Sequence, residues 1–263
     1  MALGDAYDGF LVDLDGVVWV GGEVVGGAVE ALNSLLAAGK PVVFVTNNPA
    51  LPPTVYEERL REAGIEAGDG SVLTAGEVTA RLAAEAAGPE GGAFAIGAPG
   101  FRELVGAAGL SVLDGEAGRE ADVVLVSGHR GFDYEELLTA TFALHGGAAL
   151  FATSRDPTLP MPGGAWPGTG AILAAVETAA GRTAEIGGKP EPHLFEAARE
   201  RLGDAERTAM VGDRISSDIE GGRRAGLDTV LVLTGACTRE EAEAADPPPD
   251  HVLESIADLA PDR

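Results

Sequence analysis

The stretch FLVDLDGVVWV, Phe10 to Val20, decides the fold, because two acidic residues interrupt a run that otherwise resembles a buried strand. Asp13 and Asp15 lie two positions apart, so their carboxylates repel each other and resist burial. A chain tolerates such a pair where a strand ends at a site that also holds positive charge. The segment therefore predicts a buried strand that leads into a functional crevice.

Strand-like and helix-like segments alternate along the chain. Apolar runs at 10–15 and 41–48 are followed by segments with helical spacing at 28–39 and 54–65. The last third of the chain repeats this alternation. Strands that alternate with helices favour a parallel sheet covered on both faces. We therefore predict an α/β protein.

Polar residues fall where four of the predicted strands end. Ligands of open parallel sheets bind at the carboxyl ends of the strands, so these four ends are expected to converge. They have the sequences VDLDG (12–16), VTNN (45–48), IGGKP (186–190) and VGDRISSD (211–218). The side chains that they would bring together are Asp13, Asp15, Asp213, Asp218, Lys189, Thr46, Asn47 and Asn48.

This set of side chains indicates a metal ion and a phosphate. Clustered carboxylates do not all stay ionised unless a cation shares the site. Oxygen ligands without nearby Cys or His select a hard ion, for which Mg²⁺ is the default, and such an ion commonly binds a phosphate as well. Lys189 and Thr46 suit phosphate oxygens, and a carboxylate can attack phosphorus to form an aspartyl-phosphate.

The four segments resemble the four motifs of the haloacid dehalogenase-like (HAD) phosphatases: DLDGV, TNN, GKP and GDRISSD, in that order. Longer stretches, such as ATSRDPTLP and VGDRISSDIEGGRRAGLDTVLVLTG, extend the resemblance over nearly the whole chain, to subclass IIA. This is the NagD-like and p-nitrophenylphosphatase-like branch. The resemblance implies a Rossmann-like core of residues 1–75 and 181–263 with an inserted α/β cap of residues 76–180. The glycine- and proline-rich stretches 86–93 and 157–170 are candidate hinges.

The resemblance also implies roles for the acidic residues. Asp13 would be the nucleophile that takes the phosphoryl group. Asp15 would be the general acid and later the base for water. Mg²⁺ would be held by Asp13, by the backbone carbonyl of Asp15 and by Asp213.

Further roles fall to residues around these acids. Asp218 would orient Lys189 or a metal-bound water, and it is also a candidate N-cap of the helix that follows, a role compatible with the first. Thr46 and Lys189 would bind oxygens of the transferring phosphoryl group. Asn47 and Asn48 would contribute to the phosphate or substrate side of the site.

Four residues of the expected cap are candidates for substrate specificity: His129, Arg130, Arg155 and Asp156. Related sequences often carry Asp in place of His129, and commonly have Asn in place of Ser154. These departures leave the expected core chemistry intact, but they limit what the resemblance says about the substrate. The two tryptophans, Trp19 and Trp166, are interpreted as packing residues.

Composition restricts the class of partner. The chain has 263 residues and a net charge of -24, which argues against nucleic acid or an anionic membrane as a partner. No apolar run has the length of a transmembrane helix. The first residues carry no basic region, so a signal peptide is not expected. The single cysteine, Cys237, fits a reducing cytoplasm.

The expected function is that of a cytoplasmic, Mg²⁺-dependent phosphatase acting on small phosphate monoesters. Candidate substrates are glycerol phosphate, phosphoglycolate, sugar phosphates and nucleotides, and the family allows a homo-oligomer formed through the cap. One alternative is a phosphotransferase that passes the phosphoryl group to a second alcohol. Another is a receiver-like module regulated by phospho-Asp, although a receiver lacks an acid at the position of Asp15.

Overall fold

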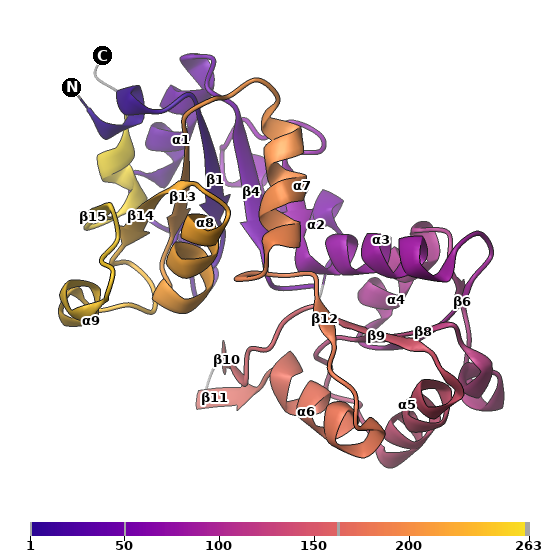
Figure 1. Ribbon diagram of the computed structural model, residues 1–263. Helices are drawn as coiled ribbons and strands as arrows, with labels where there is room; N and C mark the ends of the chain where they lie inside the picture. The colour runs from indigo at the N-terminus through magenta and orange to yellow at the C-terminus, as the bar shows by residue number, and fades with distance from the viewer. Residues whose placement is uncertain (1, 50, 162–163, 261–263) are drawn as a thin grey trace. The chain divides into compact units, whose positions relative to one another are not determined.

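A computed structural model describes residues 2–49, 51–161 and 164–260, which form two compact units (Figure 1). The first unit comprises Met1–Thr46, Pro53–Leu73 and Lys189–Arg263, and the second comprises Asn47–Pro52 and Thr74–Gly188. Each unit has its own sheet, and the predicted α/β class is confirmed. The division into a catalytic core of 1–75 and 181–263 and a cap of 76–180 stays a prediction.

The first unit is built on a six-stranded sheet with the order β15-β14-β13-β1-β4-β5. Its strands are β1 (Gly9–Asp13), β4 (Val42–Thr46), β5 (Val72–Thr74), β13 (Thr208–Gly212), β14 (Asp228–Val232) and β15 (His251–Leu253). Strand β1 pairs in parallel with β13 on one side and with β4 on the other, and its residues are all buried. Asp13 lies opposite Val45, and Val12 opposite Val211, so these three strands end at the same edge.

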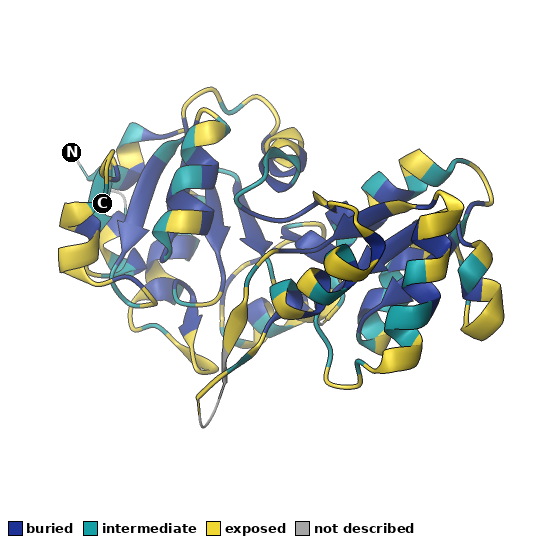
Figure 2. Cartoon of the chain, turned by 60° about the horizontal axis from the view of Figure 1, so that its bottom comes forward, coloured by how far each residue is buried: buried dark blue, intermediate teal, exposed yellow. Residues whose placement is uncertain are grey.

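Helices and short turns cover this sheet. They are α1 (Ala28–Ala37), α2 (Pro53–Glu62), α7 (Pro192–Leu202), α8 (Glu220–Arg224), α9 (Arg239–Ala244), 3-10 turns at Leu3–Ala6 and Ile256–Leu259, and a π-helical turn at Ile215–Ile219. Phe10 and Val12, which share one face of β1, join one core with Leu32 and Leu35 of α1. Figure 2 shows buried strands between helices that expose their outer sides. A small hairpin, β2 (Trp19–Val20) with β3 (Glu23–Val24), follows β1.

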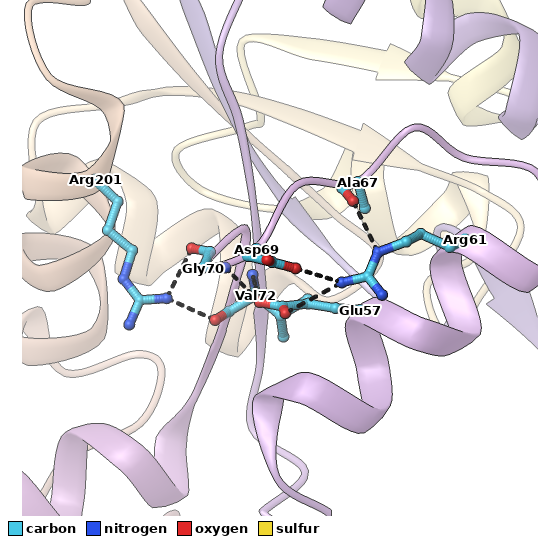
Figure 3. Close-up of polar contacts among 7 residues, drawn as sticks. All are labelled: Glu57, Arg61, Ala67, Asp69, Gly70, Val72 and Arg201. Atoms are coloured by element: carbon cyan, nitrogen blue, oxygen red, sulfur yellow. Dashed lines mark hydrogen bonds and ion pairs between the residues drawn. The ribbon is translucent and has the colours of Figure 1, made fainter.

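Buried Glu57 of α2 fixes the loop that leads into β5 (Figure 3). Its Oε1 accepts hydrogen bonds from the backbone N–H of Gly70 at 2.8 Å and of Val72 at 3.4 Å. Arg61 lies 3.6 Å from its other oxygen, and Arg201 donates to the carbonyls of Gly70 and Val72. The edge strand β5 is therefore held by charged groups from two helices.

We expect Glu57→Gln to lower the free energy of unfolding by about 2 kcal/mol, because charge-assisted hydrogen bonds to buried backbone groups become neutral. Chemical denaturation checks this value. Glu58→Gln is the matched control, since Glu58 is the exposed neighbour on the same helix and should change stability by less than about 0.5 kcal/mol. Equal effects of the two substitutions would contradict the role assigned to Glu57.

The second unit is built on a five-stranded sheet with the order β12-β9-β8-β6-β7. Its strands are β6 (Gly92–Ile96), β7 (Ser111–Val112), β8 (Val123–Val126), β9 (Ala149–Ala152) and β12 (Glu185–Ile186), all paired in parallel. Its helices are α3 (Ala75–Ala87), α4 (Pro99–Ala107), α5 (Tyr134–Gly146) and α6 (Thr169–Ala180), with a 3-10 turn at Gly115–Glu120. Helices α3 and α4 share one apolar cluster with the sheet, and α5 and α6 share another.

The two stretches predicted as hinges both lie inside the second unit. Residues 157–170 contain an antiparallel hairpin, β10 (Thr158–Met161) with β11 (Gly164–Pro167), and residues 86–93 connect α3 to β6. The hinge interpretation is wrong, because the chain passes between the units at 46–47, 52–53, 73–74 and 188–189. Within the described ranges, no helix has the length and apolar character needed to cross a bilayer.

Candidate active site

The carboxyl edge of the first sheet holds a buried ammonium between two buried carboxylates. Asp13 is the last residue of β1, and Lys189 begins the last segment of the first unit. The Nζ atom of Lys189 lies 2.8 Å from Oδ1 of Asp13 and 2.6 Å from Oδ1 of Asp218. All three residues are buried, with Lys189 only 3% exposed. Ion pairs of Lys189 thus connect segments that are far apart in the sequence.

A third carboxylate, that of Asp213, makes this site strongly acidic. Asp13, Asp213 and Asp218 each offer an oxygen, and these atoms lie within 4.8 Å of one another. Burial raises the pKa of Asp213 to about 6, and the negative charge of Asp218 adds to the rise. Burial also raises the pKa of Asp13, which Lys189 opposes. Keeping all three carboxylates ionised therefore costs free energy that an additional cation would offset.

Asp213 is enclosed by backbone and retains one unsatisfied oxygen. Its Oδ2 accepts a hydrogen bond from the backbone N–H of Ala236 at 2.7 Å. Its Oδ1 is buried and has no hydrogen-bond partner among the described residues. A Cβ at Gly16 would lie 2.2 Å from Oδ2, and one at Gly235 would lie 2.0 Å from it. Only glycine allows so close an approach. Gly235 is a position of the site that sequence reasoning missed, because only the fold brings it to Asp213.

Asp218 is positioned to orient Lys189. Its Oδ1 accepts the bond from Lys189, and its Oδ2 accepts one from the backbone N–H of Arg214 at 3.0 Å. Burial lowers the pKa of Lys189, but attraction to Asp13 and Asp218 outweighs burial and raises it overall, so the group stays an ammonium. The additional role of Asp218 as an N-cap is wrong, because α8 begins after Ile219 and has no side-chain cap bond.

Asp15 and Thr46 lie on the same edge. Thr46 is buried at the end of β4, one position beyond the residue that pairs with Asp13. Asp15 is exposed, and its Oδ1 accepts a hydrogen bond from Nε1 of Trp19 at 2.9 Å. The two acids of the opening motif therefore occupy different environments: Asp13 is enclosed beside Lys189, whereas Asp15 is open to solvent.

Comparison with known proteins identifies the class of site. A family model described as haloacid dehalogenase-like hydrolase matches residues 10–111, and a HAD-hydrolase-like model matches residues 186–259. Chronophin of Mus musculus is 41% identical over 273 residues, which cover 98% of this chain and 93% of that protein. The chain belongs to the haloacid dehalogenase-like hydrolases.

Two solved structures place this HAD hydrolase in the predicted branch. A glycerol phosphate phosphatase from Mycobacterium tuberculosis, in complex with magnesium, has a TM-score of 0.90 and 32% identity, covering 100% of this chain and 79% of that chain. A 4-nitrophenylphosphatase from Thermotoga maritima has a TM-score of 0.89 and 34% identity, covering 98% of each chain. The chain is therefore an enzyme of the phosphatase type, and the receiver-like alternative has no support.

Asn47 and Asn48, predicted to bind phosphate or substrate, follow Thr46 directly in this HAD hydrolase but belong to the second unit. Nδ2 of Asn47 donates to Oδ2 of Asp156 at 3.3 Å, and Asn48 is exposed. The link between Asn47 and Asp156 joins the TNN motif to a loop of the second unit. The roles of all three residues stay predictions.

The other specificity candidates also have partners within the second unit. Nε2 of His129 lies 3.0 Å from a carboxylate oxygen of Glu136. The guanidinium of Arg130 lies 4.6 Å from the centre of the Trp166 ring. Arg155 forms two hydrogen bonds to the carboxylate of Glu177, at 3.0 and 2.8 Å. The roles of these side chains in specificity stay predictions of the sequence.

Proposed function

We propose that the chain is a Mg²⁺-dependent phosphatase that hydrolyses small phosphate monoesters through an aspartyl-phosphate on Asp13. The observation that carries the proposal is the contact between the buried carboxylate of Asp13 and the ammonium of Lys189, with Asp213 beside them and Asp15 exposed two residues on. Lys189 and Thr46 would bind the transferring phosphoryl oxygens.

The acidic residues fit a hard divalent cation. Oδ1 of Asp213, which has no hydrogen-bond partner in the described part of the chain, and a carboxylate oxygen of Asp13 are suitable ligands. The backbone carbonyl of Asp15 would be a third. Asp218 is less suited, because both of its oxygens already accept hydrogen bonds. When bound, Mg²⁺ would neutralise charge on the phosphoryl group, as phosphoryl transfer requires.

The residues of this chain then divide the reaction into two steps. A carboxylate oxygen of Asp13 attacks phosphorus, the bond from phosphorus to the ester oxygen breaks, and the carboxylic acid of Asp15 gives its proton to the departing alkoxide. In the second step the carboxylate of Asp15 takes a proton from water, whose oxygen attacks phosphorus. The bond from Asp13 to phosphorus breaks, which releases phosphate and restores the Asp13 carboxylate.

The cap, the substrate class, the oligomeric state and the cellular location are also part of the proposal. The second unit would act as the cap that excludes water and selects the leaving group, with His129, Arg130, Arg155 and Asp156 as the specificity residues. Similarity to a glycerol phosphate phosphatase supports a small phosphorylated metabolite as the substrate, and the net charge of -24 disfavours nucleic acid. A homo-oligomer formed through the cap is part of the same proposal, and so is a cytoplasmic location, which the single cysteine favours.

We expect phosphate release to depend on the metal. A panel of phosphomonoesters should be hydrolysed with Mg²⁺ or Mn²⁺, activity should disappear in EDTA, and Ca²⁺ should substitute poorly because its larger shell places the phosphate differently. Addition of excess Mg²⁺ after EDTA should restore the rate. Full activity after exhaustive chelation would contradict the metal assignment.

The same assay distinguishes the phosphotransferase alternative. Small alcohols added as acceptors should leave the amount of inorganic phosphate equal to the amount of alcohol released from the ester. A shortfall of phosphate, matched by a new phosphate ester of the acceptor, would show transfer rather than hydrolysis.

A further inference from the structure

Trp19 was interpreted from the sequence as a packing residue, and its ring is indeed buried, with 1% exposure. Its polar atom, however, is directed at the exposed acid of the site: Nε1 lies 2.9 Å from Oδ1 of Asp15. Burying an indole in a core does not by itself place its N–H on a carboxylate that the reaction uses. This hydrogen bond therefore calls for a role beyond packing.

The backbone around Trp19 holds this contact in place. The N–H of Gly16 donates to the carbonyl of Trp19 at 2.8 Å, and the N–H of Trp19 donates to the carbonyl of Leu14 at 3.2 Å. Asp15 and Trp19 also form a β-bridge, and Trp19 pairs with Val24 in the hairpin. The turn therefore brings the indole back onto the acid four residues before it.

The ring itself also contacts α2. The guanidinium of Arg59 lies 4.1 Å from the centre of the Trp19 ring, within the range of a cation–π interaction. Tyr56 lies one turn earlier on α2 and is buried. Burial is the main cause of its raised pKa, and the negative charge of Asp15 is the second. Asp15 is thus exposed to solvent, while two buried aromatic residues, Trp19 and Tyr56, interact with it.

We propose that Trp19 is a positioning residue for the general acid. Its N–H binds one oxygen of Asp15, which leaves the other oxygen to carry the proton to the leaving group. As that proton departs, the same N–H stabilises the carboxylate that remains, because hydrogen bonds to ionised acceptors are stronger than those to neutral ones. The inference rests on the proposed function, in which Asp15 protonates the departing alkoxide.

This role predicts a dependence on the leaving group. A nitrophenolate leaves readily without protonation, whereas an unsubstituted phenolate is more basic and needs the acid more. Ring-substituted phenyl phosphates share a shape and differ in this property. The value of kcat/KM reports the step in which the ester bond breaks, so a weakened acid should lower it most for the poorest leaving group.

The test is Trp19→Phe, which keeps an aromatic ring and removes the N–H. We expect kcat/KM to fall by about 10-fold or more for phenyl phosphate and by less than about 3-fold for p-nitrophenyl phosphate. The larger loss is part of the roughly 10²–10⁴-fold rate increase that a general acid typically contributes. In an Asp15→Asn background the same substitution should add no further leaving-group dependence, because the acid that it positions is gone.

The matched control is Tyr7→Phe. Tyr7 is also a buried aromatic residue, and its hydroxyl lies 3.0 Å from Nε2 of His251, but it precedes β1 at the end opposite Asp13. Tyr7→Phe should leave the dependence of kcat/KM on leaving-group basicity unchanged. If Trp19→Phe fails to fold, Trp19 replaced by 3-benzothienylalanine, which exchanges only the N–H for sulfur, gives the same measurement.

Each outcome separates the two claims. The role of Trp19 would be overturned if Trp19→Phe lowered kcat/KM equally for every substrate, or not at all, while Asp15→Asn showed a steep dependence of kcat/KM on leaving-group basicity. Asp15 would then remain the acid. A flat slope in Asp15→Asn would instead overturn the role of Asp15 in the proposed function, and with it the inference about Trp19.

Discussion

Asp13→Asn is expected to lower turnover by about 10⁴-fold or more, because an amide does not form the aspartyl-phosphate. The same substitution should leave the metal-free protein as stable as the wild type, or more stable by about 1 kcal/mol. The reason is electrostatic: Asp13 is buried with Asp213 and Asp218, and the positive charge of Lys189 beside them does not prevent the rise in the pKa of Asp13. Asparagine keeps an oxygen that can accept the bond from Lys189.

Mg²⁺ should reverse this order of stability. The wild type gains stability by binding the ion, whereas Asp13→Asn has lost a carboxylate ligand and gains less. Thermal melting of both proteins in EDTA and in excess Mg²⁺, beside a phosphate-release assay, makes the comparison. A mutant that is markedly less stable in EDTA would show that Asp13 has a mainly structural role, and near-normal turnover would place the nucleophile elsewhere.

Lys189→Met should produce the largest loss of stability. Methionine has a similar length but no charge, so Asp13 and Asp218 lose the ammonium that bridges them at 2.8 and 2.6 Å. Removing one partner from a buried ion pair leaves an uncompensated charge, which typically costs about 3–5 kcal/mol. Turnover should also fall, by about 10²–10³-fold, because a cation that stabilises the transferring phosphoryl group is gone.

Lys40→Met is the matched control, since Lys40 is the only other lysine of the chain. Its ammonium is half-buried and donates to the backbone carbonyl of Tyr7, so its loss should cost about 1 kcal/mol. Mg²⁺ should raise the melting temperature more in Lys189→Met than in the wild type, because the ion then supplies the missing positive charge. A Lys189→Met protein as stable as Lys40→Met in EDTA would contradict the account of the buried charges.

Much of the first unit could be predicted from the sequence, because its strands are short apolar runs that end in polar residues. To predict that Asp13 and Thr46 lie close together, it was enough to assume that parallel strands end at the same edge of a sheet. The parallel register between β1 and β4 satisfies this condition. The expectation for Lys189 was wrong in one respect: the short strand before it, β12, pairs with β9 in the sheet of the second unit and is not a neighbour of β1 and β4. Charge, and not strand order, accounts for its contact with Asp13.

Other features depend on contacts that no local pattern encodes. The stretch 157–170 is rich in proline and glycine, which favours a loop, yet it forms a two-stranded hairpin, where edge positions tolerate proline. The segment after β13 contains a π-helical turn, Ile215–Ile219, and Asp218 in this turn accepts the bond from Lys189. The N–H of Trp19 likewise acquires its partner only when the hairpin folds back.

The most direct test of the account is to trap the intermediate in Asp15→Asn. With p-nitrophenyl phosphate the leaving group departs without an acid, but water then lacks its base, so the phosphorylated enzyme should accumulate. Mass spectrometry of the acid-quenched protein should find one added phosphoryl group, located on Asp13, together with a burst of nitrophenolate equal to the enzyme concentration. No phosphorylated protein despite that burst, or a phosphoryl group on another residue, would contradict the central claim.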